Sequence, residues 1–207
     1  MKTRVILLFL FAVASLSFTK HVKKTYPFEK WRSSQLDSAN TAKNIKSLSD
    51  DEKNVIFFTN LVRVNPKLFG ETYAQNYIDS TKDHSSFAQS LLTELKTKKA
   101  LPPLQVDSVL CVTSADHATK TGKAGTVNHD GQEERYDKVK KRFGSWGENC
   151  DFGKGNAFCI VMRLLIDQDN ADFGHRENIL ADDFTHIGTA IRPHKIYGLV
   201  CVQDFGG

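Results

Sequence analysis

The sequence contains few cysteines, prolines and tryptophans, and neither sign of charge dominates. It has four Cys, five Pro and two Trp in 207 residues. Lysine plus arginine number 28 against 24 acidic residues, which gives a formal net charge of +4. This excess is too small to predict a nucleic-acid-binding protein. The length fits one compact domain.

Several motifs of catalytic and nucleotide-binding sites are also missing. The chain has no His-Glu-x-x-His zinc motif, no Gly-x-Ser-x-Gly nucleophile motif and no phosphate-binding glycine loop. It has no Cys-x-x-Cys pair either, which excludes the usual zinc-finger patterns. The sequence therefore points to no standard enzyme class.

The first residues have the order of a secretory signal peptide. Lys2 and Arg4 precede an apolar run from Val5 to Phe18 that contains small residues. The run is shorter than the roughly 20 apolar residues that span a bilayer, so we expect no transmembrane anchor. We predict a signal peptide over residues 1–18 and a secreted or periplasmic protein. Residues 19–48 are polar with little periodicity, which predicts a linker or a partly disordered segment.

From residue 49 onward, the pattern predicts helices first and strands last. Ser49 and Glu52 have the spacing of a capping box, which starts a helix that extends to about Val64. Further helices are predicted from Pro66 through Tyr77, over Ser86–Lys98, from Asp107 to near Gly122, and over Ala157–Ile166. Strands are predicted at Trp146–Phe152, Ile187–Ile191 and Ile196–Phe205. This order predicts an α+β fold with an antiparallel sheet covered by helices.

Four cysteines follow the predicted leader: Cys111, Cys150, Cys159 and Cys201. An even number in an exported chain permits two disulfides, for example Cys150 with Cys159 and Cys111 with Cys201. Buried free thiols, which pack like small apolar side chains, are the alternative. The sequence leaves both open.

Three polar, glycine-bearing segments contain the best candidates for site chemistry. They span residues 128–131, 147–149 and 174–178, and include His129, Glu148 and His175. Imidazole nitrogen and carboxylate oxygen are ordinary zinc ligands, and histidine also serves in acid–base catalysis. By contrast, we expect structural roles for His117 on its helix and for Asn60 and Arg63, which are one helical turn apart.

The same segments, in this order, resemble the CAP superfamily of cysteine-rich secretory proteins, antigen-five allergens and plant pathogenesis-related proteins. The resemblance is to the bacterial-type, SCP-like extracellular domains and extends from about Ser49 to Phe205. The motifs that carry it are Thr59–Pro66, Ala115–Ala118, Asn128–His129, Gly147–Asn149, Gly174–Leu180, Ile187–Ala190 and Val202–Phe205.

This resemblance implies an α-β-α sandwich with a central, mostly antiparallel sheet over residues 49–207. It also implies a cleft with two histidines and two acids, which in some members holds a divalent metal such as zinc. His129, Glu148 and His175 match family positions and would be the metal ligands. The fourth position does not match; Asp167 is the nearest acid, and Asp169 is an alternative.

The resemblance also bears on function. It favours a secreted, non-catalytic binding module whose extracellular ligand, a lipid or a protein, is unidentified, with no role for nucleic acid. A metal-dependent or His/acid hydrolase of the protease type is the first alternative, and a lipid or sterol carrier is the second. Whether the protein is an enzyme stays open at this point.

Overall fold

The computed structural model describes residues 27–207 except 169 and 171. The predicted signal peptide and residues 19–26 lie outside this part. The described helices are the 3-10 turn Phe28–Lys30, α1 Ser33–Ala39, α2 Asp50–Val64, α3 Pro66–Phe69, the π-helical turn Gly70–Ala74, α4 Gln75–Thr81, α5 Ser86–Thr97, α6 Ser108–Ala124, α7 Gln132–Val139, α8 Ala157–Ile166 and α9 Gly174–Leu180. The strands are β1 Gln105–Val106, β2 Trp146–Phe152, β3 His186–His194 and β4 Gly198–Gly206. Within the described residues, no helix has the length and apolarity needed to cross a bilayer.

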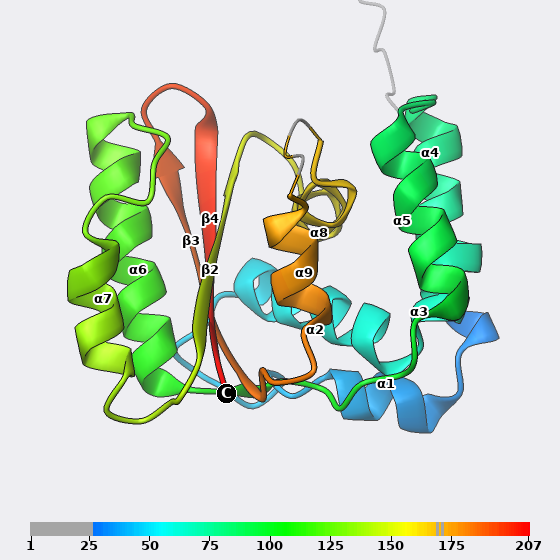
Figure 1. Ribbon diagram of the computed structural model, residues 1–207, viewed down its shortest axis with the longest axis horizontal. Helices are drawn as coiled ribbons and strands as arrows, with labels where there is room; N and C mark the ends of the chain where they lie inside the picture. Colours follow the sequence, from blue (N-terminus) through cyan, green and yellow to red (C-terminus); the bar gives the residue numbers. More distant parts are fainter. Residues whose placement is uncertain (1–26, 169, 171) are drawn as a thin grey trace, which may run out of the picture.

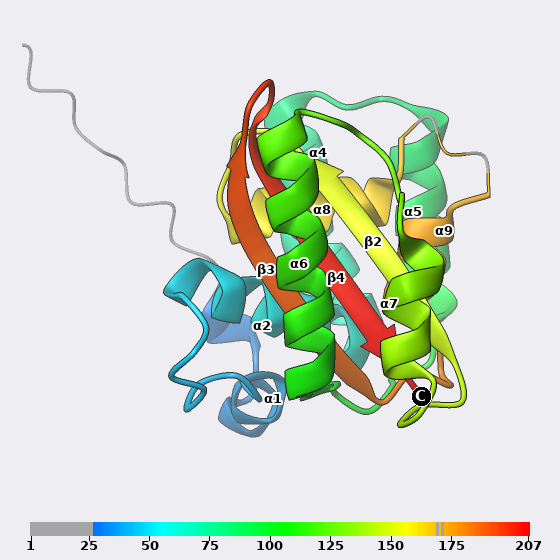
Figure 2. The ribbon, with the colours of Figure 1, turned by 90° about the vertical axis from the view of Figure 1, so that its left-hand side faces the viewer.

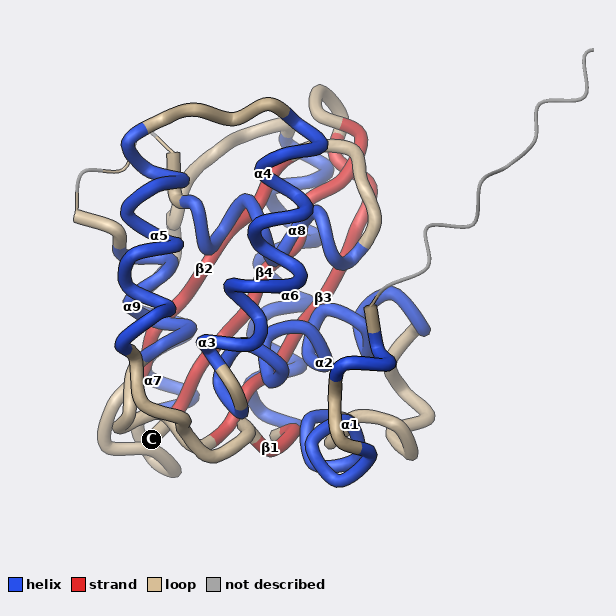
Figure 3. The backbone as a smooth tube through the Cα atoms, turned by 90° about the vertical axis from the view of Figure 1, so that its right-hand side faces the viewer, coloured by secondary structure: helices blue, strands red, loops and turns tan. Residues whose placement is uncertain are grey.

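The four strands form one mixed sheet in the order β1-β3-β4-β2. The short β1 is parallel to β3, whereas β4 is antiparallel to both of its neighbours. Helices α6 and α7 cover one face, and α2, α8 and α9 cover the other, with α4 and α5 outside them (Figures 1 to 3). The predicted α+β class and α-β-α sandwich are therefore confirmed.

Close contact between α6 and the sheet places the first helical layer. Gly188 of β3 permits this contact, because an added Cβ would lie 2.0 Å from the carbonyl carbon of Leu110. Gly125 then ends α6 in the left-handed region, at φ 76°. The chain turns back there, which brings the following loop alongside the helix that it has just left.

The predicted helix starts agree with the structure. The Ser49 side chain accepts from the amide of Glu52, and Glu52 accepts from the Ser49 amide at 2.8 Å. The side chains of Asp107 and Asn156 also accept from first-turn amides, of α6 and α8 respectively, without the returning bond. Each cap satisfies amides that the first helical turn leaves unpaired, which is why these short polar residues mark helix starts.

Residues 27–48 differ from the expected linker, because the described part of this segment packs against the domain. Trp31 is 5% exposed and, like Ala39, Ala42 and Leu48, belongs to the main core. Its ring lies 5.9 Å from that of Tyr73. These apolar residues are isolated in the sequence, so no periodic pattern identified them. Their order comes from tertiary packing rather than from local helix propensity.

Asn60 and Arg63 of α2 hold neighbouring segments together, as the sequence predicted. Asn60 accepts from the amide of Leu104 at 2.8 Å and donates to the Ala39 carbonyl at 3.2 Å. The buried Arg63 guanidinium donates to four backbone carbonyls at 2.7–3.0 Å. Both side chains use charge or polarity to satisfy buried backbone groups.

The structure corrects the disulfide prediction, because all four cysteines are free thiols. Cys150 packs with Ala118 on the α6 side of the sheet, whereas Cys201 belongs to the core on the opposite side. A sheet thus separates the two most buried thiols. The free-thiol alternative holds, and the cysteines act mainly as small apolar side chains.

Candidate functional site

The candidate site is built on the edge strand β2, whose side chains alternate between the two faces of the sheet. Glu148 and Cys150 face α6, and Cys150 packs against that helix. Asn149 and Asp151 face α8 and α9; Asn149 donates to the carbonyl of His175 at 3.0 Å. The strand therefore divides the polar residues of this region into two groups.

The first group is a compact cluster of His117, His129, Glu148 and Cys150, whose ligand-type atoms all lie within 4.8 Å of one another. The Nδ1 atom of His129 lies 2.7 Å from Glu148 Oε1 and 3.8 Å from Cys150 Sγ. His117 Nε2 lies 3.7 Å from the same carboxylate oxygen and 3.0 Å from the carbonyl of Asn128. The chain reverses after Gly125, and this reversal brings His129 close to His117 on α6.

Arg135 of α7 neutralises the carboxylate at the centre of this cluster. Its Nε and Nη2 donate to the two oxygens of Glu148 at 2.6 and 2.7 Å. It also donates to the carbonyl of Asp130 at 2.7 Å, which fixes the loop that carries His129. Burial opposes ionisation of Glu148, but hydrogen bonds from His129 and Arg135 outweigh it and lower the pKa of this carboxyl.

The pKa values of His117 and Cys150 favour neutral side chains. Burial lowers the pKa of His117, although Glu148 opposes the effect. Burial also raises the pKa of Cys150 well above its usual value, with a further contribution from Glu148. The Nε2 atom of neutral His117 donates to the Asn128 carbonyl, so a metal would have to replace this hydrogen bond. A protonated thiol is a weak nucleophile. The cluster is therefore better suited to binding than to nucleophilic catalysis.

A second acid lies beside Glu148. Asp204 of β4 is its cross-strand partner and is fully buried, and Thr113 of α6 donates to its Oδ2. Its Oδ1 has no hydrogen-bond partner within the described part of the chain. Burial and the neighbouring charge of Glu148 raise the pKa of Asp204 well above the ordinary aspartate value. The opposite directions of the two pKa shifts place the negative charge on Glu148, beside Arg135, and favour a neutral Asp204.

The second group lies on the opposite face of β2, where His175 of α9 pairs with Asp167. His175 Nδ1 is 2.7 Å from Asp167 Oδ1, and the His175 amide donates to the other oxygen at 2.9 Å. Asp167 itself has φ 55°, a left-handed conformation that the surrounding hydrogen bonds stabilise. Burial opposes ionisation, but the bond from His175 outweighs it and lowers the pKa of Asp167.

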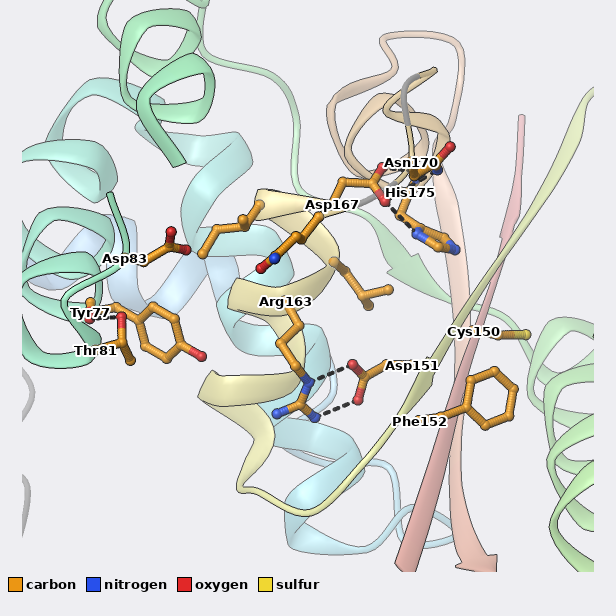
Figure 4. A pocket seen from close by; sticks show the side chains of 13 residues that line it. Tyr77, Thr81, Asp83, Cys150, Asp151, Phe152, Arg163, Asp167, Asn170 and His175 are labelled. Carbon is orange, nitrogen blue, oxygen red and sulfur yellow. Dashed lines mark hydrogen bonds and ion pairs between the residues drawn. The ribbon is translucent and has the colours of Figure 1, made fainter. Parts of the chain in front are cut away.

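A cavity of about 650 Å³ opens next to this pair, between α4, α8 and β2 (Figure 4). Asp151 and Arg163 form a bidentate ion pair in it, at 2.6 and 2.7 Å. Tyr77 and Asp83 line its far side, as Figure 4 shows. Its walls mix aromatic and charged groups, which suits a polar ligand better than a purely apolar one.

The structure divides the four predicted site residues into two pairs. His129 and Glu148 meet in the cluster, and His175 and Asp167 meet on the other side of β2; the described cluster does not include His175. The alternative acid Asp169 lies outside the described residues. This differs from the expected site of His129, Glu148 and His175. Glu148 points to the α6 face of β2, whereas His175 approaches β2 from the other face, where Asn149 points.

The sequence did not identify two members of the cluster, His117 and Cys150, or two residues beside it, Arg135 and Asp204. Cys150 carried a usable signal, since it is two residues after Glu148 on a predicted strand and so shares its face. His117 lies twelve residues before His129, a spacing that points to contact only if the helix ends at Gly125 and the chain reverses. Arg135 and Asp204 gave no local signal, because α7 and β4 approach Glu148 only in the folded chain.

Comparison with known proteins decides the family. Residues 59–205, more than half of the chain, match the CAP model, described as the cysteine-rich secretory protein family. The chain belongs to the CAP family. No curated protein matches it.

Solved structures of other proteins resemble this chain to different degrees. The venom allergen-like protein 4 of Schistosoma mansoni has 14% identity and a TM-score of 0.50, with 77% of this chain and 89% of that chain covered. An extracellular SCP-domain protein from Bacillus anthracis has 22% identity and a TM-score of 0.43, with 58% of this chain and 38% of the other covered. A cysteine-rich secretory protein from Staphylococcus aureus has 15% identity and a TM-score of 0.41, with 64% and 38% covered. The chain thus spans little more than a third of these two bacterial proteins.

Proposed function

We propose that this CAP domain is an extracellular, non-catalytic binding module whose His117–His129–Glu148–Cys150 cluster takes up a divalent metal such as zinc. The observation that supports the metal is the convergence of four ligand-type atoms within 4.8 Å. Extracellular placement is supported by the signal-peptide pattern of residues 1–18 and by the CAP relatives whose names describe secreted or extracellular proteins.

Two of the distances within the cluster fit a tetrahedral ion. Zinc–ligand bonds of roughly 2.0–2.3 Å place tetrahedral ligands roughly 3.3–3.8 Å apart. His117 Nε2 is 3.7 Å from Glu148 Oε1, and Cys150 Sγ is 3.8 Å from His129 Nδ1. The 2.7 Å contact between His129 and Glu148 is shorter. A metal would replace this hydrogen bond, and the two side chains would separate slightly. Since the His129 side chain is 43% exposed, an ion can reach the cluster from solvent.

The charges set the expected strength of binding. Arg135 already occupies both oxygens of Glu148, so its positive charge competes with an incoming cation. Cys150 must also lose a proton that burial makes hard to remove. We therefore expect weak zinc binding that is readily reversed by chelators and that weakens as pH falls, because the ligands must be deprotonated.

The polar cavity beside His175 and Asp167 is the proposed site for the extracellular ligand. Asp151, Arg163 and Asp167 place charged groups on its walls, which argues against a lipid or sterol as its occupant. A hydrolase would need a nucleophile with a base and an orienting group. The described cluster offers only Cys150, whose pKa is raised by burial. The binding-module interpretation is therefore favoured over both alternatives.

Calorimetric titration with zinc tests the proposal, using the exported protein and two matched histidine variants. His129→Ala removes a cluster ligand and should lower the zinc affinity at least tenfold. His175→Ala removes a histidine that pairs with an acid on the other face of β2 and should leave the affinity unchanged. Equal affinities in wild type and His129→Ala would refute metal binding by the cluster.

A further inference from the structure

One end of the molecule presents an apolar and basic surface that the proposed metal cluster does not use. It consists of the β3–β4 turn and the adjoining ends of α6 and β2, and we call it the hairpin tip. Ile196 is 67% exposed, Val127 56% and Tyr197 47%. These are three of the six large hydrophobic residues that are exposed in the described chain. Apolar exposure is thus concentrated at this end.

The hairpin tip is held in place rather than loosely extended. His194 is 4% exposed, and its Nδ1 accepts from the amides of Ile196 and Tyr197 at 3.2 and 3.1 Å. Its Nε2 lies 3.1 Å from the carbonyl of Thr126, which ties the turn to the loop after α6. The amide of Lys195 also bonds to Gly122 at 3.0 Å. Ile196 and Tyr197 therefore stay exposed because the backbone beneath them is fixed.

The chain segments that form the hairpin tip carry basic side chains and no acidic ones. Lys123, Lys154 and Lys195 are exposed, and none forms an ion pair within the described part of the chain. Lys154 packs on the turn, since a Cβ at Gly198 would lie 3.0 Å from its Cγ. Residues 118–128, 152–157 and 193–200 contain no aspartate or glutamate. Lys120, one turn before Lys123 on α6, differs from these three because it pairs with Asp116 at 3.0 Å.

We propose that the hairpin tip docks on an anionic lipid surface. Ile196 would enter the acyl boundary, and Tyr197 would lie at headgroup level, where its ring and hydroxyl suit the two environments. The three lysines would face anionic headgroups, each adding to the attraction within a Debye length of the surface. The apolar area alone is small, so binding depends on both features together. Figure 2 shows the β3–β4 turn at one end of the molecule, next to the end of α6.

Vesicle sedimentation tests this proposal with the exported protein. The probes are vesicles of phosphatidylcholine alone and of phosphatidylcholine with phosphatidylglycerol. We expect binding to the anionic vesicles only, with a loss on addition of salt. The double substitutions Ile196→Ser/Tyr197→Ser and Lys154→Glu/Lys195→Glu should each lower the partition coefficient roughly tenfold or more. All proteins are compared with the same N-terminus, so any contribution from the leader cancels.

Two control substitutions separate the hairpin tip from general surface effects. Val112→Ser removes a side chain that is 63% exposed near the start of α6, and Lys96→Glu reverses an exposed charge on α5. Both should bind vesicles like wild type. Circular dichroism confirms that each variant is folded before its binding is interpreted.

Three results would overturn the proposal. They are equal binding to both kinds of vesicle, no binding to either kind, and anionic binding that survives both double substitutions. None of these outcomes bears on the zinc titration, because the substituted residues make no contact with the metal cluster.

Discussion

Replacement of Arg135 by methionine tests whether the charge of Glu148 depends on this guanidinium. The Glu148 side chain is fully buried, Arg135 is 3% exposed, and two bonds of 2.6 and 2.7 Å join them. Methionine fills a similar volume but leaves a buried carboxylate with only His129, at 2.7 Å, and His117, at 3.7 Å, as described partners. Loss of one member of a buried pair costs about 3–5 kcal/mol, so Arg135→Met should lower the free energy of unfolding by that amount.

Urea unfolding near neutral pH measures this loss, and Arg142→Met is the matched control. Arg142 also pairs with a buried acid, Asp107, at 2.8 Å, but its side chain is 56% exposed. Solvent screening limits such a pair to about 1 kcal/mol or less. If Arg135→Met costs no more than Arg142→Met, then Glu148 does not depend on Arg135 and the electrostatic account of the cluster fails.

The pH dependence of the same variant has a defined sign. The pKa of Glu148 is lowered in the folded wild type, so its contribution to stability is present above the ordinary glutamate range. This contribution is lost as pH falls through the folded-state pKa. The difference in stability between wild type and Arg135→Met should therefore narrow in acid. A difference that stays constant from neutral pH to acid would contradict the assignment.

Three further substitutions test other parts of the structure. Burial and Glu148 raise the folded-state pKa of Asp204, so its favourable contribution to folding stability exists below the ordinary aspartate pKa and is lost as pH rises. Asp204→Asn should therefore stabilise the protein at neutral pH and not in acid, as thermal melts at both pH values would show. Trp31→Ala should cost about 3–5 kcal/mol in urea unfolding, because Trp31 is 5% exposed, whereas a loss under 1 kcal/mol would mean that residues 27–48 do not stabilise the domain. Arg63→Met removes four hydrogen bonds to backbone carbonyls and should cost about 3–5 kcal/mol, with Arg63→Lys less damaging; equal unfolding midpoints for wild type and Arg63→Met would contradict this.

Local sequence signals predicted the elements whose stability depends on local chemistry. The capping residues Ser49, Asp107 and Asn156 marked the starts of α2, α6 and α8, since each satisfies amides within its own helical turn. The strand predicted at Trp146–Phe152 has the same bounds as β2. In contrast, α9 was read only as a polar motif, because its seven residues mix polar side chains with the buried Ile179 and Leu180.

The candidate site shows where such signals stop. His129 and Glu148 were expected to meet, and they do, but the sequence also placed His175 with them. Whether two side chains near one strand meet depends on which face each occupies, and His175 approaches β2 from the face of Asn149. His117 was assigned a structural role because its helical neighbours are small and apolar. Its contact with the cluster arises from the chain reversal after Gly125, which no local pattern places in three dimensions.

Cobalt(II) titration tests most directly which side of β2 holds the metal, because a thiolate ligand to cobalt produces a charge-transfer band in the near ultraviolet. The cluster account predicts this band in wild type and in His175→Ala, and its loss in Cys150→Ser with weakened binding in His117→Ala and His129→Ala. Cobalt binding that persists unchanged in Cys150→Ser and His129→Ala but disappears in His175→Ala would contradict the account and assign the metal to the opposite face.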